Sequence, residues 1–526
     1  MILLWLFIIT VGGGIAAWIV GWWSSTAARW ASLISLCVDF ALLVFVWVAY
    51  GTAGGSTSDQ PWLLQFDYPW IAPLGIRFHL AVDGLSLLLL TLTAFLGIAA
   101  VSASWTEIQE RVGAFHLTLL LTLAGVMGVF MALDLFLFYF FWELMLVPMY
   151  FLISIWGHEN RVWAAVKFFL FTQAGGLLIF VAIVALYFIQ GRNTGVYSFA
   201  YRHLLGAAVP EPLAFWLMLF FFLGFTVKLP IVPLHTWLPD AHTEAPTAGS
   251  VVLAGLLLKT GAYGLLRFTL PLFPKESAEL AGAAMTLGTI GVLYGAFLAF
   301  AQSDAKRLVA YTSISHLGFA LLGIYTGTRL GLQGAIVILL AHGLSTGGLF
   351  IVVGALQERL HTRRMDELGG LWSSMPRLGG VAMVLALASL GLPGLANFVG
   401  EFLVLTGAFG VSPSLAVIAS IGFILSLIYS LWLIYRVFQG PERESRPNVD
   451  LGAREMAVFG AIIAGIVWLG VCPQPVLRAA GPAVESLVNR EAGVESPPRS
   501  TETNTAARWV GRAVVSSSLE AMHDSR

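Results

Sequence analysis

Apolar segments, most of them close to the roughly 20 residues that a helix needs to cross a bilayer, follow one another along almost the whole chain. Of its 526 residues, 58% are hydrophobic and 11% are charged, whereas an ordinary soluble domain carries about 25% charged residues. This composition excludes a soluble enzyme, a nucleic-acid-binding protein and a disordered protein. The sequence therefore predicts an all-α polytopic membrane protein surrounded by the lipid bilayer.

The apolar pattern predicts about fourteen transmembrane helices. The segment 115–156 has 42 residues and would be about 63 Å long as one helix, so we predict two helices that meet near Asp134. The first segment has no basic residue before it and no cleavage site of small residues, and we interpret it as a retained helix rather than a signal peptide. The predicted spans are 1–23, 31–50, 84–105, two within 115–156, 162–189, 213–238, 249–272, 281–302, 308–325, 332–356, 379–409, 415–437 and 455–476.

Two predicted helices contain prolines near their middle, Pro230 and Pro233 in one and Pro393 in the other. Proline removes a helical hydrogen bond and clashes with the preceding turn, so both helices are predicted to be discontinuous. The breaks at Pro230 and Pro393 are 163 residues apart, and the spans that begin at Phe115 and Ala281 are 166 apart. This offset predicts two five-helix repeats, which must be inverted because five is odd. Such paired discontinuous helices are typical of ion transporters.

These repeats divide the chain into five parts. Three helices (1–114) precede the first repeat (115–272) and the second repeat (273–437). A loop with the last helix (438–478) then leads to a polar C-terminal tail (479–526). The tail is rich in Ser, Ala, Glu and Arg and has little periodicity, so we predict that it is mobile.

The lysines and arginines predict the orientation of the chain in the membrane. Loops on one side of the predicted bundle hold fourteen basic residues, loops on the other side hold six, and six more follow the last predicted span. Because positive charge is enriched in cytoplasmic loops, both termini are predicted to lie on the outer side. Two of the 28 basic residues, Lys228 and Lys259, are left over, and both lie inside predicted spans.

Four charged residues interrupt the apolar spans: Glu143, Lys228, Lys259 and Glu401. Lys259 comes eleven residues after Ala248, which places it about 16 Å into the bilayer. A charge at the bilayer centre costs about 2.5–3.5 kcal/mol even on the most lenient scale, and such residues usually line ion pathways. We therefore interpret these four residues as functional and the chain as an ion translocator.

Other polar residues in the spans are less informative. Asp39 and Asp134 lie closer to span ends or in an early helix, and we interpret them as structurally paired. His316 and His342 also lie within spans, and their position alone fits either a hydrogen-bonded core residue or a functional residue.

The sequence offers no site for a redox cofactor. Cys37 and Cys472 each stand alone in an apolar stretch, which excludes a disulfide framework, an iron–sulfur ligand set and a zinc site. No dinucleotide fingerprint follows a predicted strand. We therefore predict that no cofactor binds to this chain.

A family resemblance is strongest in residues 228–267, with the run KLPIVPLHTWLPDAHTEAPTAGSVVLAGLLLKTGAYGLLR. This run resembles the signature of the proton-conducting antiporter-like subunits of respiratory complex I and of their Mrp-antiporter relatives. LDLFLFYFFWELMLVPMY (133–150) and GLPGLANFVGEFLVL (391–405) match as well, so the resemblance covers essentially the whole membrane part.

One position separates the branches of this family. L-type and N-type subunits, and Mrp D-type subunits, resemble one another in having lysine in the second broken helix, whereas M-type subunits have glutamate. Glu401 occupies this position, and the chain ends without the long lateral helix of the L-type subunits. The chain thus resembles the M-type subunits of bacterial NADH–quinone oxidoreductase.

The resemblance implies a proton-translocating subunit of an NADH–quinone oxidoreductase in the bacterial inner membrane, without redox chemistry of its own. FMN, iron–sulfur clusters and quinone are expected in partner subunits, whose NADH oxidation and quinone reduction would drive the pumping. L-type and N-type antiporter-like subunits are the expected neighbours, and no nucleic acid is expected.

The resemblance also implies roles for the residues on the input side and in the centre. Glu143 and Lys228 resemble the ion pair at the input side of the family's proton path. His235, just after the first break, matches a family histidine near Lys228. Lys259 resembles the central relay lysine.

On the other side of the centre, His316 and His342 are similar in position to family residues beside the relay lysine. Glu401 resembles the acid at the exit side. The resemblance implies that a proton passes from the central lysine through the histidines and water to Glu401, which releases it outward.

Two other functions stay open. A subunit of an Mrp-type sodium/proton antiporter, or of a membrane-bound hydrogenase-type complex, would use the same scaffold. Glu401, within the run NFVGEF, favours the M-type subunit over both. A structural spacer is the second alternative, and Lys228 and Lys259 on successive predicted helices argue against it.

Overall fold

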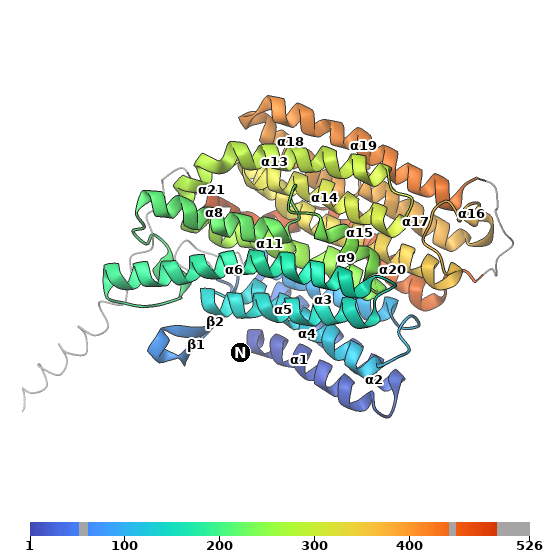
Figure 1. Ribbon diagram of the computed structural model, residues 1–526, viewed down its shortest axis with the longest axis horizontal. Coiled ribbons are helices and arrows are strands. Elements are labelled where there is room, and N and C mark those ends of the chain that lie inside the picture. Colours follow the sequence, from blue (N-terminus) through green and yellow to red (C-terminus); the bar gives the residue numbers. More distant parts are fainter. Residues whose placement is uncertain (52–61, 441–448, 492–526) are drawn as a thin grey trace, which may run out of the picture.

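The computed structural model describes residues 1–51, 62–440 and 449–491, and Figure 1 shows them as a bundle of helices. In this part of the chain, thirteen helices are long and apolar enough to cross a membrane. Two shorter apolar helices, α17 (Pro376–Ser389) and α18 (Ala396–Val411), follow one another. If α17 and α18 count as one interrupted crossing, the bundle has the fourteen crossings that the sequence predicts.

The helices before and within the first repeat follow the predicted order. The N-terminal part contains α1 (Ile2–Val20), α2 (Ser25–Val46), the π-helical turn η1 (Trp47–Gly51) and α3 (Gly84–Ala103). The first repeat contains α4 (Val112–Met131), α5 (Leu135–Trp156), α6 (Arg161–Thr194), the short α7 (Tyr201–Leu204), α8 (Glu211–Lys228), α9 (Trp237–Glu244) and one continuous helical stretch made of α10 (Thr247–Val252), η3 (Leu253–Leu257), α11 (Leu258–Gly264), η4 (Leu265–Thr269) and α12 (Leu270–Leu272).

The second repeat has the same order of long and interrupted helices. Its elements, with those that follow, are α13 (Pro274–Phe300), α14 (Ala305–Ile324), α15 (Arg329–Leu360), α16 (Leu371–Ser374), α17, α18, α19 (Pro413–Phe438), α20 (Ala453–Val471) and α21 (Gln474–Glu491). In both repeats the fourth crossing is the interrupted one. The all-α polytopic fold with two broken helices is therefore confirmed.

Asp134 separates α4 from α5, as predicted for the segment 115–156. Its carboxylate accepts hydrogen bonds from the backbone N–H groups of Phe136 at 3.0 Å and Leu137 at 3.1 Å, which caps the start of α5. The same carboxylate accepts the N–H of Arg77 at 3.1 Å. Capping satisfies backbone donors that a helix start leaves free, so Asp134 has a structural role here.

The two breaks are closed by side chains that bind freed backbone carbonyls. Between α8 and α9, the Trp237 indole N–H donates to the carbonyl oxygen of Val227 at 2.9 Å. Between α17 and α18, the Ser426 hydroxyl donates to the carbonyl oxygen of Leu390 at 3.1 Å. Away from water, an unsatisfied carbonyl would cost several kcal/mol, roughly, so these contacts allow the helices to stay broken.

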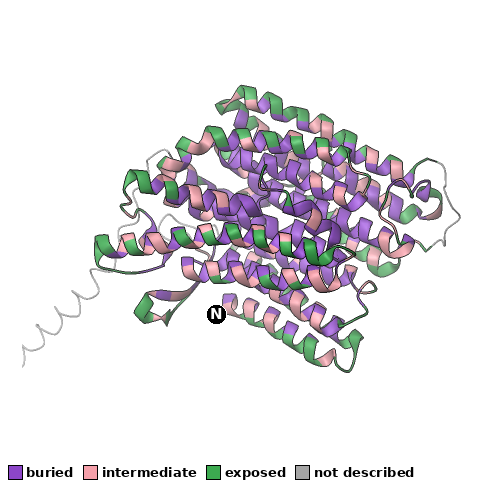
Figure 2. Ribbon diagram, in the orientation of Figure 1, coloured by how far each residue is buried: buried purple, intermediate pink, exposed green. Residues whose placement is uncertain are grey.

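The core of the bundle is formed by the continuous stretch from α10 to α12, by α14 and by α15 (Figure 2). Residues of these helices are almost all buried, whereas α6, α13 and α19 on the outside alternate between buried and exposed positions. All but one of the predicted intramembrane functional residues lie in or against this core, and Glu143 on α5 is only half-buried.

A β-hairpin joins η1 to α3, where no element was predicted. Strands β1 (Leu64–Ile71) and β2 (Ile76–Val82) pair antiparallel, with the 3-10 turn η2 (Ala72–Leu74) and Gly75 between them. Gly75 has φ +66°, a conformation that favours glycine. The hairpin escaped prediction because it is short and lies between much longer apolar segments.

The prediction of a tail with little regular structure from residue 479 is wrong for the first part of that segment. Helix α21 runs to Glu491 and buries Val476, Ala480 and Val484 against the bundle, where it packs on α3 and α15. Consequently the last crossing ends at Val471, before the predicted end of the span at residue 476. The rest of the tail, 492–526, lies outside the described residues.

Candidate functional site

Lys259 lies in the middle of the buried stretch from α10 to α12, with no exposed surface. Its ammonium group donates a hydrogen bond to the carbonyl oxygen of Ala254, in the π-helical turn η3. A π-helical turn widens the backbone and frees carbonyls from the usual pattern, and such turns are frequent at functional sites. The Lys259 Nζ also lies 2.6 Å from Nδ1 of His342 on α15.

His316 on α14 connects this pair to the second broken helix. Its Nδ1 lies 2.8 Å from the Oε1 of Glu401 on α18. Its Nε2 lies 3.2 Å from the Ser389 hydroxyl and 3.3 Å from the Tyr429 hydroxyl. The ring centroids of His316 and His342 are 5.8 Å apart.

Four titratable side chains therefore form a row across the core: Lys259, His342, His316 and Glu401. None is more than 1% exposed. They come from α11, α15, α14 and α18, so helices of both repeats contribute. A buried row of groups that each bind and release a proton can carry protons, because each neighbour is within hydrogen-bond distance or one short gap away.

The break between α17 and α18 leaves space for the Glu401 carboxylate. Gly391 has φ +79°, and a β-carbon added to it would lie 3.1 Å from the Oε2 of Glu401. Gly394, in the same break, has φ +92°, but an added β-carbon would meet no atom within 4 Å. The absent side chain at Gly391 thus lets the carboxylate approach the broken backbone.

Gly391→Ala is expected to slow proton transfer through Glu401 several-fold, because the added methyl group displaces the carboxylate. Gly394→Ala is the matched control, since it adds the same backbone strain, about 1–2 kcal/mol, without touching Glu401. The rate of proton translocation by the purified complex in liposomes, at equal NADH oxidation, measures both. Equal rates in the two variants would contradict this role of Gly391.

The predicted ion pair of Glu143 and Lys228 is not in direct contact. The Lys228 ammonium lies over the rings of Trp142 at 5.3 Å and Phe168 at 5.5 Å, and no hydrogen-bond acceptor reaches it among the described residues. Glu143 is half-buried, and its Oε1 accepts a hydrogen bond of 3.4 Å from Gln173. The two charges still attract one another across the gap.

His235 lies in the first break, between α8 and α9. It is 5% exposed, its ring meets the edge of Tyr294 at 5.4 Å, and its Nδ1 has no partner among the described residues. It therefore stands apart from the row around Lys259.

Three polar residues near the C-terminal end of α9 were not predicted as site residues: Glu107, His242 and Lys306. His242 and Lys306 have no exposed surface, and Glu107 is half-buried. From the sequence, Lys306 belongs to the loop residues because it precedes the predicted span 308–325. His242 lies inside the run 228–267, but no role is predicted for it. Neither residue stands out in the hydropathy pattern, because its burial depends on how distant helices pack.

An arginine joins the two repeats at this end of the bundle. Arg363, after α15, binds the carboxylate of Asp304 at 2.6 Å and that of Glu244 at 3.2 Å, and it donates to the carbonyl oxygen of Thr243 at 2.7 Å. Asp304 begins α14 in the second repeat, whereas Glu244 ends α9 in the first. Arg363 thus fixes the end of the first broken helix.

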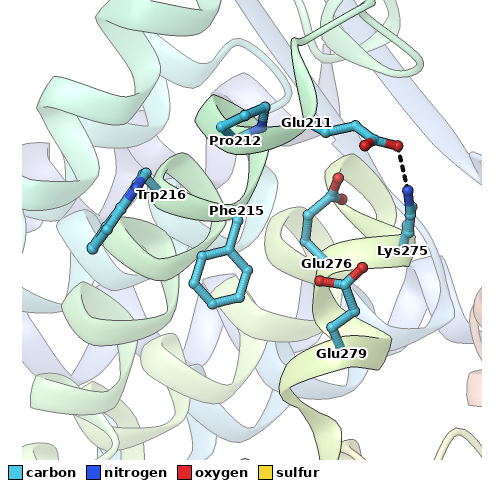
Figure 3. Close-up of a pocket in the computed structure, with 7 residues that line it drawn as sticks. All are labelled: Glu211, Pro212, Phe215, Trp216, Lys275, Glu276 and Glu279. Carbon is cyan, nitrogen blue, oxygen red and sulfur yellow. Dashed lines mark hydrogen bonds and ion pairs between the residues drawn. The ribbon is translucent and has the colours of Figure 1, made fainter.

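The pocket in Figure 3 lies away from the row, at the N-terminal ends of α8 and α13. The figure shows Glu276 and Glu279 beside the ion pair of Lys275 and Glu211, whose atoms are 2.5 Å apart. This ion pair is exposed, and we assign the pocket no role in the path. Within residues 1–51, 62–440 and 449–491, no cluster of His, Cys, Asp or Glu is arranged to hold a metal ion.

The fold and the row agree with what the chain is similar to. The family described as "NADH:quinone oxidoreductase/Mrp antiporter, TM" matches residues 132–428, which include the row and both breaks. The chain belongs to this family. The matched region runs from the start of α5 into α19.

Among relatives in this family, NADH-quinone oxidoreductase subunit M of Pseudomonas aeruginosa is 53% identical, over 91% of this chain and 95% of that protein. The subunit M of Escherichia coli is 49% identical, over 93% and 97%. A chain of respiratory complex I from Thermus thermophilus, solved with bound NADH, matches with a TM-score of 0.83 and 31% identity, over 94% of this chain and all of that chain. These relatives favour the M-type interpretation.

A chain of the Mrp complex from Dietzia shares the fold, with a TM-score of 0.77, 21% identity and coverage of 93% and 98%. At this identity the likeness concerns the fold alone. The comparisons therefore favour the NADH–quinone oxidoreductase branch over the Mrp alternative that the sequence left open.

Proposed function

We propose that this chain is the M-type membrane subunit of an NADH–quinone oxidoreductase and carries protons along Lys259, His342, His316 and Glu401. The observation that carries this proposal is the buried row itself, in which Lys259 meets His342 at 2.6 Å and His316 meets Glu401 at 2.8 Å. Within each of these two contacts, the side chains can exchange a proton, because one atom can donate it and the other can accept it.

The contact of Lys259 with His342 favours proton transfer. A lysine ammonium donates in this hydrogen bond, and a neutral imidazole Nδ1 accepts, so the two groups share one positive charge rather than carrying two. After transfer to His342, the proton crosses the gap to His316. His316 then delivers it to Glu401, whose carboxylate accepts it at the break between α17 and α18.

Glu143 and Lys228 control the input side in this proposal. The buried Lys228 ammonium rests on two aromatic rings and has no hydrogen-bond acceptor among the described residues. Its positive charge is therefore stabilised mainly by the rings and by the distant Glu143 carboxylate. When Glu143 is neutralised or moves away, Lys228 is poised to release its proton toward Lys259.

The energy for this movement comes from partner subunits. We assign NADH oxidation and quinone reduction, with FMN and the iron–sulfur clusters, to partner subunits in the assembled complex. L-type and N-type antiporter-like subunits are the proposed neighbours. The proposed location is the bacterial inner membrane, with the Arg363 end of the bundle on the cytoplasmic side and both termini outside.

Glu143→Ala and Lys228→Ala test the proposal. Both variants are expected to lose most proton translocation per NADH in inverted membrane vesicles. Glu143→Ala removes the carboxylate that stabilises the protonated lysine, and Lys228→Ala removes the amine that releases the proton. Glu159→Ala is the control: Glu159 is exposed in the loop between α5 and α6, and we expect wild-type translocation. Full translocation by both input variants would refute the role of this pair.

A further inference from the structure

The buried stretch from α10 to α12 begins near Arg363 and ends beside a second ion pair. Arg267, in the π-helical turn η4, holds its Nη2 2.5 Å from the Oδ2 of Asp83, and each side chain is only 10% exposed. The other carboxylate oxygen of Asp83 accepts the N–H of Ser86 at 2.9 Å and caps the start of α3. This ion pair therefore joins the central helical stretch to α3.

The same helical stretch carries Lys259, eight residues before Arg267. At 1.5 Å per residue, this is a rise of about 12 Å, or roughly two turns. Tyr263 lies midway and is 1% exposed. Lys259 and Tyr263 are four residues apart within α11, so they are neighbours on one face of the helix. Tyr263 thus separates the central lysine from the ion pair.

The Tyr263 hydroxyl is held by fixed partners. It donates to the carbonyl oxygen of Phe130 at 3.1 Å and accepts the Nε–H of Arg267 at 3.2 Å. The Ser86 hydroxyl lies 3.1 Å from it. Because the single hydroxyl hydrogen is used by the Phe130 carbonyl, Tyr263 has no free hydrogen to pass along the helix in this arrangement.

The far side of the ion pair is covered. The Trp62 ring lies 5.1 Å from the Arg267 guanidinium. Helix α21 packs on α3 and approaches it closely at Gly84, the residue after Asp83, where an added β-carbon would lie 1.9 Å from the carbonyl oxygen of Ala479. Trp62 and α21 therefore leave little of the pair open to this end of the bundle.

Arg267 differs from the groups of the row in one chemical property. A guanidinium stays protonated at any physiological pH, whereas lysine, histidine and glutamate can gain and lose a proton when buried. Its Nε faces Tyr263 and its Nη2 faces Asp83, so the positive charge lies on the side of Lys259 and the carboxylate on the side of α3. A fixed positive charge in a poorly hydrated site repels an approaching proton.

We propose that Arg267, oriented by Asp83 and Tyr263, is an electrostatic seal that keeps protons on the outer side from returning to Lys259. This inference rests on the proposed function, because it concerns the same central lysine and the same outer side. A proton that returned along this helix would have to pass the guanidinium before it reached Tyr263. The arginine keeps its own protons throughout, so the seal involves no transfer step.

The seal is tested by the passive proton leak of liposomes that contain the purified, fully assembled complex. No NADH is added, a potassium diffusion potential drives protons through the complex, and a pH dye inside the liposomes records them. Arg267→Gln combined with Asp83→Asn removes both charges, which avoids leaving one buried charge unpaired. This charge-free variant is expected to raise the leak several-fold, and a wild-type leak would overturn the proposal.

The matched control removes an exposed ion pair from the same subunit. Arg329 and Glu485 are 3.0 Å apart, and their side chains are 61% and 58% exposed. Arg329→Gln combined with Glu485→Gln is expected to leave the leak at the wild-type level. Any rise in this control is subtracted, and a rise equal to that of the charge-free variant would overturn the seal.

Arg267→Lys separates the charge from the contacts. Lysine keeps the positive charge but lacks the planar fork that reaches both Asp83 and Tyr263. If the charge forms the seal, the leak of Arg267→Lys stays well below that of the charge-free variant. Equal leaks in these two variants would show that Arg267 only supports the packing of α3, and the proposal would fail.

Lys259→Ala connects the leak to the row and separates this inference from the proposed function. Added to the charge-free variant, Lys259→Ala is expected to lower the leak again, and an unchanged leak would overturn a seal that protects Lys259. Lys259→Ala alone is assayed for proton translocation per NADH. A wild-type value there refutes the proposed function, whereas a reduced value together with no leak in the charge-free variant refutes the seal alone.

Discussion

Replacing Glu401 by lysine is expected to abolish proton translocation through this subunit while the assembled complex still oxidises NADH. The lysine would place a second positive charge next to His316, where the structure has a carboxylate 2.8 Å from Nδ1. Proton transfer from His316 then loses its acceptor, and removing a positioned proton acceptor typically costs about 10²- to 10⁴-fold in rate. The measurement is proton uptake by liposomes that contain the purified variant complex.

Two further variants make this prediction specific. Glu401→Asp keeps an acid at the break and is expected to retain part of the translocation, since only the reach of the carboxylate changes. Glu279→Lys makes the same charge change at an exposed position in the surface pocket of Figure 3 and is expected to behave as wild type. If Glu401→Lys and Glu401→Asp translocate protons equally well, Glu401 is structural.

The largest expected loss of stability follows from Arg363→Gln. Arg363 is 19% exposed and neutralises two carboxylates that come from different repeats, Asp304 and Glu244. Removing one partner of a buried charge pair leaves the other charge uncompensated, and here we expect a cost on the order of 3 kcal/mol. The end of α9 should loosen first, because Arg363 also binds the carbonyl oxygen of Thr243.

This prediction is measured as the half-life of NADH–quinone activity of the purified complex at raised temperature. Arg364→Gln is the matched control, since Arg364 is the next residue, is 62% exposed, and its ion pairs with Asp366 and Glu367 are long, at 3.7 and 3.4 Å. We expect a much shorter half-life for Arg363→Gln and little change for Arg364→Gln. Equal half-lives would show that the Arg363 contacts do not hold the repeats together.

The broken helices could be predicted from the sequence, because proline acts locally and its effect does not depend on the rest of the fold. Pro230 and Pro393 fall inside the two gaps that the structure contains, between α8 and α9 and between α17 and α18. The four intramembrane charges were equally visible, because a charge in an apolar span is rare whatever surrounds it.

The contacts of these charges could not be predicted, because they depend on how distant helices pack. Lys259 and His342 are 83 residues apart in the chain and yet meet at 2.6 Å. Conversely, Glu143 and Lys228 were expected to form an ion pair, but the lysine instead rests on aromatic rings. Lys306 was counted as a loop residue because burial at a helix end leaves no mark in a hydropathy pattern.

The helix α21 escaped prediction for a related reason. Its residues are polar on one face and bury only a narrow apolar stripe that includes Val476 and Val484. The mean composition of this segment therefore resembles that of an irregular tail. The apolar stripe indicates a packed helix only once α3 and α15, against which it lies, are known.

Proton translocation per NADH by the assembled complex with Lys259→Ala tests the central claim most directly. Lys275→Ala is the control, because Lys275 is an exposed lysine on the surface of the same subunit. If protons pass through the row, Lys259→Ala translocates fewer protons per NADH than the wild type, and Lys275→Ala translocates as many. An unchanged number of protons per NADH in Lys259→Ala, in a complex that is fully assembled and oxidises NADH, would contradict the proposed path.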